Sequence, residues 1–161
     1  MGRIVVADAG PLHYLILIDA AFVLETLFEQ VLIPTAVRDE LSHQNTPAKV
    51  RAWLAENRAW LKIETMPDAV AVPGLHRGEA EALQLALQAK AAGVLMDDMD
   101  GRLAARRLGL MVIGTIGLLE RAAELRLLDL PQAIARLRLT NMFVSEEVLE
   151  AALARALERL P

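Results

Sequence analysis

The chain has 161 residues, of which 55% are hydrophobic, and it contains no cysteine. This length suits one domain with a real core, over residues 1–161, and the lack of cysteine excludes a disulfide framework and a thiolate metal site. The net charge of −4 argues against a protein that coats nucleic acid nonspecifically, although a local basic patch is compatible with it.

The mean hydropathy of +0.34 raises the question of a membrane protein. The most apolar stretch, residues 11–28, is broken by His13, Asp19 and Glu25, so it lacks the roughly 18 apolar residues in a row that span a bilayer. Asp8 likewise interrupts the apolar residues near the N-terminus, which argues against a signal peptide. We therefore expect a cytoplasmic protein that has no membrane partner.

Short apolar runs alternate with helical patterns along the first half of the chain. The expected strands here are residues 3–7, 31–33 and 60–64. The first of them ends at Asp8, and Pro11 suits the first turn of the helix that follows. A helix that begins at Thr35 carries Glu40 about a turn and a half from its start.

The second half repeats this alternation around an unusually acidic segment, residues 78–108. A helix opens with Glu79 and Glu81, a short strand follows, and a loop with three aspartates leads into a helix that carries arginines. The expected strands are residues 94–96 and 111–113, and the expected later helices are 116–126, 130–139 and 145–160. The whole pattern predicts a three-layer α/β/α fold around a central parallel sheet of four or five short strands.

Several acids are expected at one edge of this sheet. Asp8 follows the first strand, the Asp97 loop follows another, and helices that run back against the strands begin at the same edge. The acids that could meet there are Asp8, Glu40, Glu79, Glu81, Asp97, Asp98 and Asp100. Clustered carboxylates raise one another's pKa unless a cation neutralises them, and oxygen ligands suit Mg²⁺ or Mn²⁺. Taken singly, each acid is also explained by a helix dipole or a capping loop.

The remaining polar residues give weaker signals. The three histidines occur singly, without the spacing of a zinc site, and no nucleotide-binding glycine motif is present. The Thr115 hydroxyl follows a strand at the acidic edge, where it could also be a plain helix cap. Arg102 and Arg106 are spaced one helical turn apart and could hold a phosphate backbone, or simply form a solvated face on which Arg102 pairs with Asp98.

Five short motifs, in this order and spacing, resemble the PIN-like proteins of bacteria and archaea. The motifs are DAGPL at 8–12, VRDEL at 37–41, GEAEAL at 78–83, LMDD at 95–98 and VIGTIG at 112–117. The resemblance implies a PIN fold with a central parallel sheet and a metal-dependent ribonuclease site of three or four acids. Many such relatives are toxins of toxin–antitoxin pairs, and many dimerise.

The resemblance also implies roles for individual residues. Asp8, Glu40, Glu81 and Asp98 match the four acids of the family's catalytic site, in that order. Asp97 is an extra acid beside the fourth, and we expect it to join Asp8, Glu81 and Asp98 as a metal ligand. Glu79, Asp100 and Thr115 are secondary candidates, and Arg102 and Arg106 are candidates for phosphate binding. Two departures are visible: Ala9 and Gly10 stand where a hydroxyl residue often follows the first acid, and the third acid is glutamate instead of the commoner aspartate.

We therefore expect an endoribonuclease that uses Mg²⁺ or Mn²⁺ and acts on single-stranded or structured RNA. A role as the toxin of a toxin–antitoxin pair, with a small antitoxin protein as partner and a homodimeric state, follows from the same resemblance. One alternative is a non-catalytic PIN scaffold that binds RNA or a protein. Another is a receiver-like or phosphatase-like phosphoryl-transfer protein, but a receiver needs a lysine after a late strand and none follows Lys90.

Overall fold

A computed structural model describes residues 3–160, and these form one five-stranded sheet in which every pair of neighbours is parallel. The strands are β1 (Ile4–Ala7), β2 (Gln30–Pro34), β3 (Leu61–Glu64), β4 (Gly93–Leu95) and β5 (Val112–Ile113). Their order is β3-β2-β1-β4-β5, so β1 is central, and its Val6 lies opposite Leu32 of β2 and Val94 of β4. The predicted parallel sheet of short strands is confirmed.

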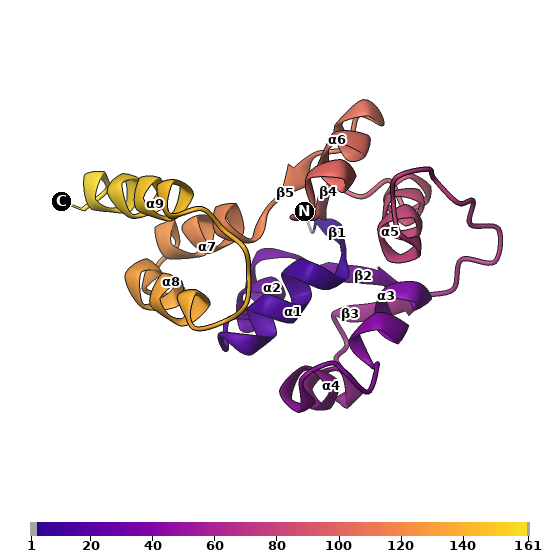
Figure 1. The fold of residues 1–161 in the computed structure, drawn as a ribbon, viewed down its shortest axis with the longest axis horizontal. Coiled ribbons are helices and arrows are strands. Elements are labelled where there is room, and N and C mark those ends of the chain that lie inside the picture. Colours follow the sequence, from indigo (N-terminus) through magenta and orange to yellow (C-terminus); the bar gives the residue numbers. More distant parts are fainter. Residues whose placement is uncertain (1–2, 161) are drawn as a thin grey trace.

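Helices connect the strands and cover both faces of the sheet (Figure 1). They are α1 (Ala9–Leu17), α2 (Phe22–Leu27), α3 (Thr35–Leu41), α4 (Ala48–Ala55), α5 (Arg77–Gln88), α6 (Met99–Arg107), α7 (Thr115–Glu124), α8 (Leu130–Arg138) and α9 (Glu146–Glu158). The first helix begins directly after Asp8, which has the extended backbone of an N-cap residue, and Pro11 lies in its first turn as predicted.

The strands are apolar on both sides because each side faces a separate part of the core. Val5 and Ala7 of β1 pack in the larger cluster with residues of α1, α2, α7, α8 and α9, whereas Val6 packs in a smaller cluster beneath α5 and α6. Continuous burial of this kind is expected for a parallel sheet between two helical layers. The arrangement is the predicted α/β/α sandwich.

The sheet directs the ends of several segments to one edge. Residues 65–76 form a long connection without helix or strand, and they deliver the chain to the start of α5 beside the carboxyl ends of the strands (Figure 1). Asp8 after β1 and Asp97 after β4 meet the same edge. Within residues 3–160, no helix combines the length and the apolar character that crossing a bilayer requires.

Candidate metal centre

Asp8 lies at the middle of the carboxyl edge, directly after the central strand. Its backbone N–H donates to the carbonyl oxygen of Leu95, 2.9 Å away, which ties the start of α1 to β4. The side chain is only 4% exposed, and its Oδ1 is buried without a hydrogen-bond partner. The pKa of Asp8 is raised to about 6, chiefly by burial; the Ala9 backbone N–H and His76 act to lower it, and the negative charges of Glu40 and Asp97 act to raise it.

Glu79 approaches Asp8 from the first turn of α5. His76 is the N-cap of this helix: its Nδ1 accepts the Glu79 N–H at 3.3 Å, and its Nε2 lies 2.7 Å from Glu79 Oε1. The other oxygen of Glu79, Oε2, is buried without a partner. It sits so close to the backbone of Gly101 that a Cβ there would lie 2.6 Å from it, so only glycine at 101 leaves room for Glu79.

The surroundings of Glu79 strongly favour its protonated form while no cation is present. The pKa of Glu79 is raised to about 8, chiefly by burial; the neighbouring Asp98 carboxyl group and the charge of Asp8 act in the same direction, while a backbone hydrogen bond at His76 lowers it. One atom each from Asp8, His76 and Glu79 lies within 4.8 Å of the other two. Two buried, unpartnered carboxylate oxygens in such a group are the chemistry that a divalent cation would satisfy.

Asp97 and Asp98 follow β4 and have different partners. Asp97 accepts two hydrogen bonds from the fully buried Thr115, from the backbone N–H at 2.8 Å and from the hydroxyl at 2.6 Å. Gly114, not Thr115, is therefore the N-cap of α7. Asp98 caps α6 by accepting the N–H of Gly101 at 3.2 Å, while it also faces Glu79.

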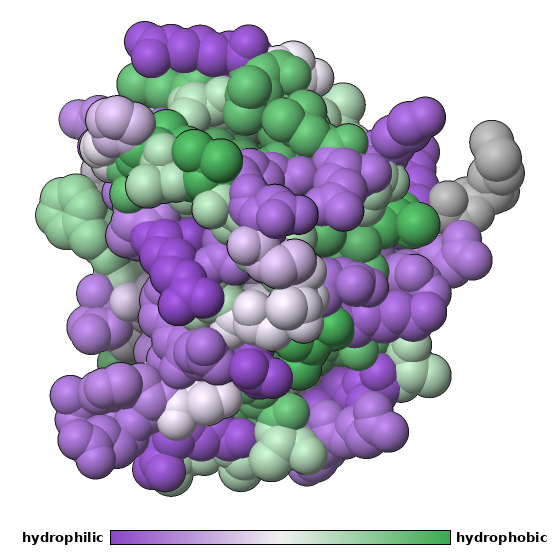
Figure 2. All heavy atoms as spheres, turned by 90° about the vertical axis from the view of Figure 1, so that its right-hand side faces the viewer, coloured by the Kyte–Doolittle hydropathy of each residue, from purple (hydrophilic) through white to green (hydrophobic). Residues whose placement is uncertain are grey.

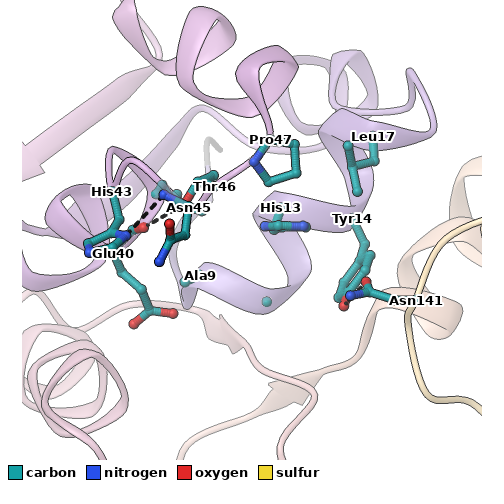
Figure 3. A pocket seen from close by; sticks show the side chains of 12 residues that line it. Ala9, His13, Tyr14, Leu17, Glu40, His43, Asn45, Thr46, Pro47 and Asn141 are labelled. Atoms are coloured by element: carbon teal, nitrogen blue, oxygen red, sulfur yellow. Dashed lines mark hydrogen bonds between the residues drawn. The ribbon is translucent and has the colours of Figure 1, made fainter.

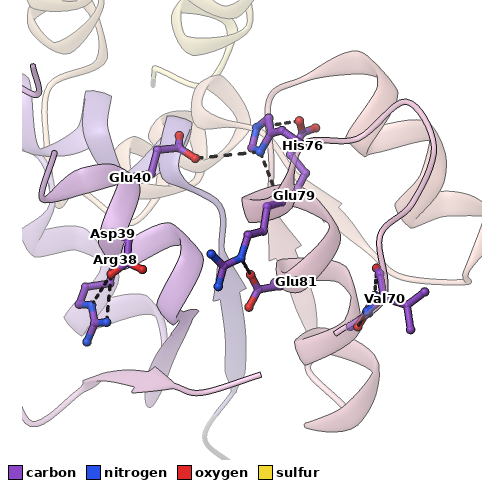
Figure 4. Close-up of polar contacts among 9 residues, drawn as sticks. Arg38, Asp39, Glu40, Val70, His76, Glu79 and Glu81 are labelled. Carbon is purple, nitrogen blue, oxygen red and sulfur yellow. Dashed lines mark hydrogen bonds and ion pairs between the residues drawn. The ribbon is translucent and has the colours of Figure 1, made fainter. Parts of the chain in front are cut away.

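Glu40 reaches the site from α3 and remains half exposed. Its Oε1 lies 4.0 Å from His76 Nδ1, as Figure 4 shows. A Cβ on Gly78 would lie 3.0 Å from the same oxygen, so the glycine allows α3 and α5 to approach closely. The structure therefore brings Asp8, Glu40 and Glu79 close to His76 at one edge, with Asp98 beside Glu79.

Glu81 lies apart from this group. Its Oε2 accepts a hydrogen bond from Arg77 Nε at 2.7 Å, further along α5 from His76 (Figure 4), and its Oε1 is buried without a partner. Residues two positions apart on an α-helix are separated by a rotation of about 200° around the helix axis, so their side chains point to nearly opposite sides. Because Glu79 faces Asp8, Glu81 cannot also face it.

The remaining candidates, Asp100, Arg102 and Arg106, lie on α6. Arg102 is partly buried, with Nη1 3.5 Å from the Met96 carbonyl oxygen, and it fills the space beside Gly114 and Asp97. Asp100 and Arg106 are exposed to solvent on the same helix. Arg102 is thus held near the acids, and Arg106 lies one turn further from them.

His76 was not among the residues predicted from the sequence. It stands alone, without a second histidine at the spacing of a zinc site. The available signal was its position: it directly precedes the helix and lies three residues before Glu79, so its ring and that carboxylate share one face of the first turn.

A groove of about 660 Å³ opens beside the acids and shares Glu40 with them (Figure 3). It is lined by Ala9, Gly10, His13, Tyr14, Leu17, Glu40, Leu41, His43, Asn45, Thr46, Pro47 and Asn141. The rings of His13 and Tyr14 are 4.8 Å apart, and the Tyr14 hydroxyl donates to Asn141 Oδ1 at 2.9 Å. The groove therefore combines aromatic faces with amide and hydroxyl groups.

Comparison with known proteins places this chain in a family. A family model described as "DUF3368: PIN domain" matches residues 4–158. Among solved structures, a PilT N-terminus domain protein from the hyperthermophilic archaeon Sulfolobus solfataricus P2 has a similar fold, with a TM-score of 0.53 and 16% sequence identity over 74% of this chain and 92% of that chain. No curated protein sequence matches the chain. The resemblance seen in the sequence motifs is confirmed, and the chain belongs to the PIN-domain family.

Proposed function

We propose that this PIN-domain protein is a metal-dependent endoribonuclease in which Asp8, Glu79 and Asp98 hold Mg²⁺ or Mn²⁺. The observation that carries the proposal is the pair of buried oxygens, Asp8 Oδ1 and Glu79 Oε2, that have no hydrogen-bond partner at the edge of the sheet. A buried carboxylate without a partner is costly, and a bound cation removes that cost. The proposal assigns to Glu79 the role that the motif resemblance assigned to Glu81.

A Mg²⁺ or Mn²⁺ ion bound by these acids would lower the pKa of an attacking water and stabilise charge on the scissile phosphate. The residues of the chain have separate tasks around it. Asp98, fixed as the cap of α6, keeps one carboxylate against Glu79, and Glu40 offers a half-exposed carboxylate that can accept a hydrogen bond from water. Arg102 is placed to hold a phosphate oxygen next to the acids, and Arg106 extends this basic track along α6.

Single-stranded RNA, or an unpaired region of structured RNA, is the proposed substrate. The groove in Figure 3 begins at Glu40, so a strand whose phosphate lies at the acids can lay its neighbouring nucleotides in it. His13 and Tyr14 offer faces on which unpaired bases can stack, which is how proteins commonly read single strands. With a net charge of −4, binding without a metal to mask the carboxylates should be weak.

We extend the proposal to a toxin that pairs with a small antitoxin protein and forms a homodimer. Exposed apolar side chains support a partner: Phe143 is 97% exposed and Leu139 is 89% exposed, and α9 buries Leu149 while it leaves Leu157 in solvent. Figure 2 also shows apolar surface near the top of the molecule. Leu103 of α6 is exposed as well. Growth arrest on expression, relieved by co-expression of a neighbouring small gene product, would support the toxin role, and a monomer in light scattering would count against the dimer.

The rival is a PIN scaffold that binds RNA or a protein without cutting it. A labelled single-stranded RNA incubated with the parent protein and Mn²⁺ or Mg²⁺ separates the two functions. We expect cleavage that stops with chelator and with Asp8→Asn, and that persists with Glu81→Gln, a matched change of a buried carboxylate outside the group. Intact RNA with the parent protein, together with Asp8-dependent Mn²⁺ binding, would favour the scaffold.

A further inference from the structure

His76 brings a nitrogen donor into a site that is otherwise built from oxygen. Its Nε2 lies 2.7 Å from Glu79 Oε1 and its Nδ1 lies 4.0 Å from Glu40 Oε1, and Figure 4 draws both pairs. One atom of Asp8 lies within 4.8 Å of one atom each of His76 and Glu79. Asp8 and Glu79 of this group each have a buried oxygen without a hydrogen-bond partner, and in Glu79 it is Oε2, the oxygen that lies against Gly101. The position of the ring is set by the backbone, because His76 is the N-cap residue of α5.

We propose that His76 is a metal ligand through Nε2 and that the centre is a mixed nitrogen and oxygen site selective for Mn²⁺ over Mg²⁺. The proposal rests on the proposed function, since it concerns the same acids. Imidazole binds first-row transition-metal ions, Mn²⁺ the most weakly of them, whereas Mg²⁺ takes oxygen ligands and keeps much of its water shell. A nitrogen ligand therefore discriminates between two ions that the carboxylates alone would treat more alike.

The ring proton must move for this ligation to occur. In the structure Nδ1 accepts the Glu79 N–H, so the neutral ring carries its proton on Nε2, 2.7 Å from Glu79 Oε1. Ligation through Nε2 requires the other neutral tautomer, with the proton on Nδ1, and Nδ1 then no longer accepts the Glu79 N–H. The half-exposed ring can exchange this proton with water, and Glu40 lies on the Nδ1 side to accept it in a hydrogen bond.

In this arrangement Glu40 is the hydrogen-bond acceptor for the second ring N–H of His76. A metal-bound histidine usually donates its second ring N–H to a carboxylate or carbonyl, and loss of such a partner costs about 10–100-fold in metal affinity or activity. The close approach of α3 to α5 at Gly78 is what brings Glu40 within reach of the ring. In this arrangement Glu40 is a positioning residue that acts through His76.

Pulsed electron paramagnetic resonance on the Mn²⁺-loaded protein tests the ligand directly, because ¹⁴N modulation appears only when nitrogen binds the ion. We expect ¹⁴N modulation in the parent protein and its loss in His76→Asn. Asparagine is a good N-cap, so this variant keeps the start of α5 while it removes the imidazole. His13→Gln and His43→Gln are the matched controls, and both should keep the signal.

Calorimetry gives a second readout that does not depend on RNA cleavage. We expect His76→Asn to weaken Mn²⁺ binding by at least about tenfold and Mg²⁺ binding by much less, so that the preference for Mn²⁺ falls. Asp8-dependent Mn²⁺ binding without ¹⁴N modulation would overturn the role of His76 and leave the acidic site standing. Absence of any Asp8-dependent Mn²⁺ binding would overturn both proposals.

Discussion

The two sides of the carboxyl edge treat their acids differently. On the side of β1 and α5, Asp8 and Glu79 are almost fully buried, and each has an oxygen without a partner. On the side of β4, Asp97 accepts two hydrogen bonds from Thr115, and Asp98 accepts one from the backbone of Gly101. The first pair destabilises the metal-free fold, whereas Asp97 holds two elements together.

This contrast separates the acids that we propose bind a cation from the acids that hold elements of the fold together. Asp8 and Asp97 both follow a strand, so position alone does not distinguish them. They differ in hydrogen bonding: Asp8 Oδ1 has no partner, whereas both oxygens of Asp97 accept hydrogen bonds from Thr115. We therefore assign the cation mainly to Asp8 and Glu79, with Asp98 at the boundary between the two groups because it both caps α6 and faces Glu79.

The largest effect should come from Asp8→Asn. It removes a central charged ligand, so RNA cleavage should fall by more than about 100-fold, since loss of an outer partner alone costs about 10–100-fold. The same change replaces a buried carboxylate with a neutral amide, so the metal-free protein should become more stable to heat. Cleavage assays and thermal unfolding without metal check the two halves; an active or destabilised variant would contradict the assignment.

The paired substitutions Glu79→Gln and Glu81→Gln compare two buried acids of one helix. Glu79→Gln should weaken Mn²⁺ binding by at least about tenfold, because it removes a carboxylate from the group around Asp8. Glu81→Gln should leave Mn²⁺ affinity close to that of the parent, because Glu81 is turned toward Arg77. Calorimetry with both variants checks this, and the opposite ranking would return the role to Glu81.

The stability of the metal-free protein should fall as the pH rises. The pKa values of Asp8 and Glu79 are raised to about 6 and about 8, above their ordinary values of 3.8 and 4.5. At pH values between the ordinary and the raised pKa, the folded state therefore binds more protons than the unfolded state. This contribution is complete below about pH 4 and is lost as the pH rises through about 6 and 8. Urea unfolding across this pH range should show that the free energy of unfolding declines, and Glu79→Gln should flatten the decline around pH 8. A free energy of unfolding that does not change with pH in the parent protein would contradict this prediction.

Thr115→Val should affect the fold more than the metal. It removes the hydroxyl that donates to Asp97 while the backbone N–H of residue 115 still donates, so we expect a loss of about 1–3 kcal/mol in the free energy of unfolding. Mn²⁺ affinity should change less in Thr115→Val than it does in Glu79→Gln. Loss of metal binding without loss of stability would move Asp97 to the cation-binding group.

Asp100→Asn should have the smallest effect of all. Asp100 is exposed in the first turn of α6, outside the close group formed by Asp8, His76 and Glu79. Cleavage and Mn²⁺ affinity should both remain near those of the parent. An effect as large as that of Asp98→Asn would show that the assignment within residues 97–100 is mistaken.

The sequence was enough to predict the sheet and the edge at which the acids meet. Strands such as 3–7 and 94–96 are buried on both faces, so their apolar runs stand out, and the acids that follow them come to one edge by topology. The choice between Glu79 and Glu81 could not be made in this way. Both occur early in the same helix, and the choice depends on the rotation of α5 about its axis, which packing against Gly101 and Asp98 sets.

His76 and Thr115 were obscured for a related reason. Their roles depend on contacts between segments that are distant or irregular: the long loop 65–76 places His76, and the end of β4 places the partner of Thr115, 18 residues away. A periodic pattern reports which face of an element is buried. It does not report which polar atoms of two different loops will meet.

The most direct test of the central claim is a crystal of the protein soaked in Mn²⁺, with anomalous diffraction to locate the ion. Our account predicts a peak that is bonded to Asp8 and Glu79 at the carboxyl edge of β1, next to His76, with Asp97 still hydrogen-bonded to Thr115. A peak bonded to Glu81 and remote from Glu79, or no peak near Asp8 at full Mn²⁺ saturation, would contradict it.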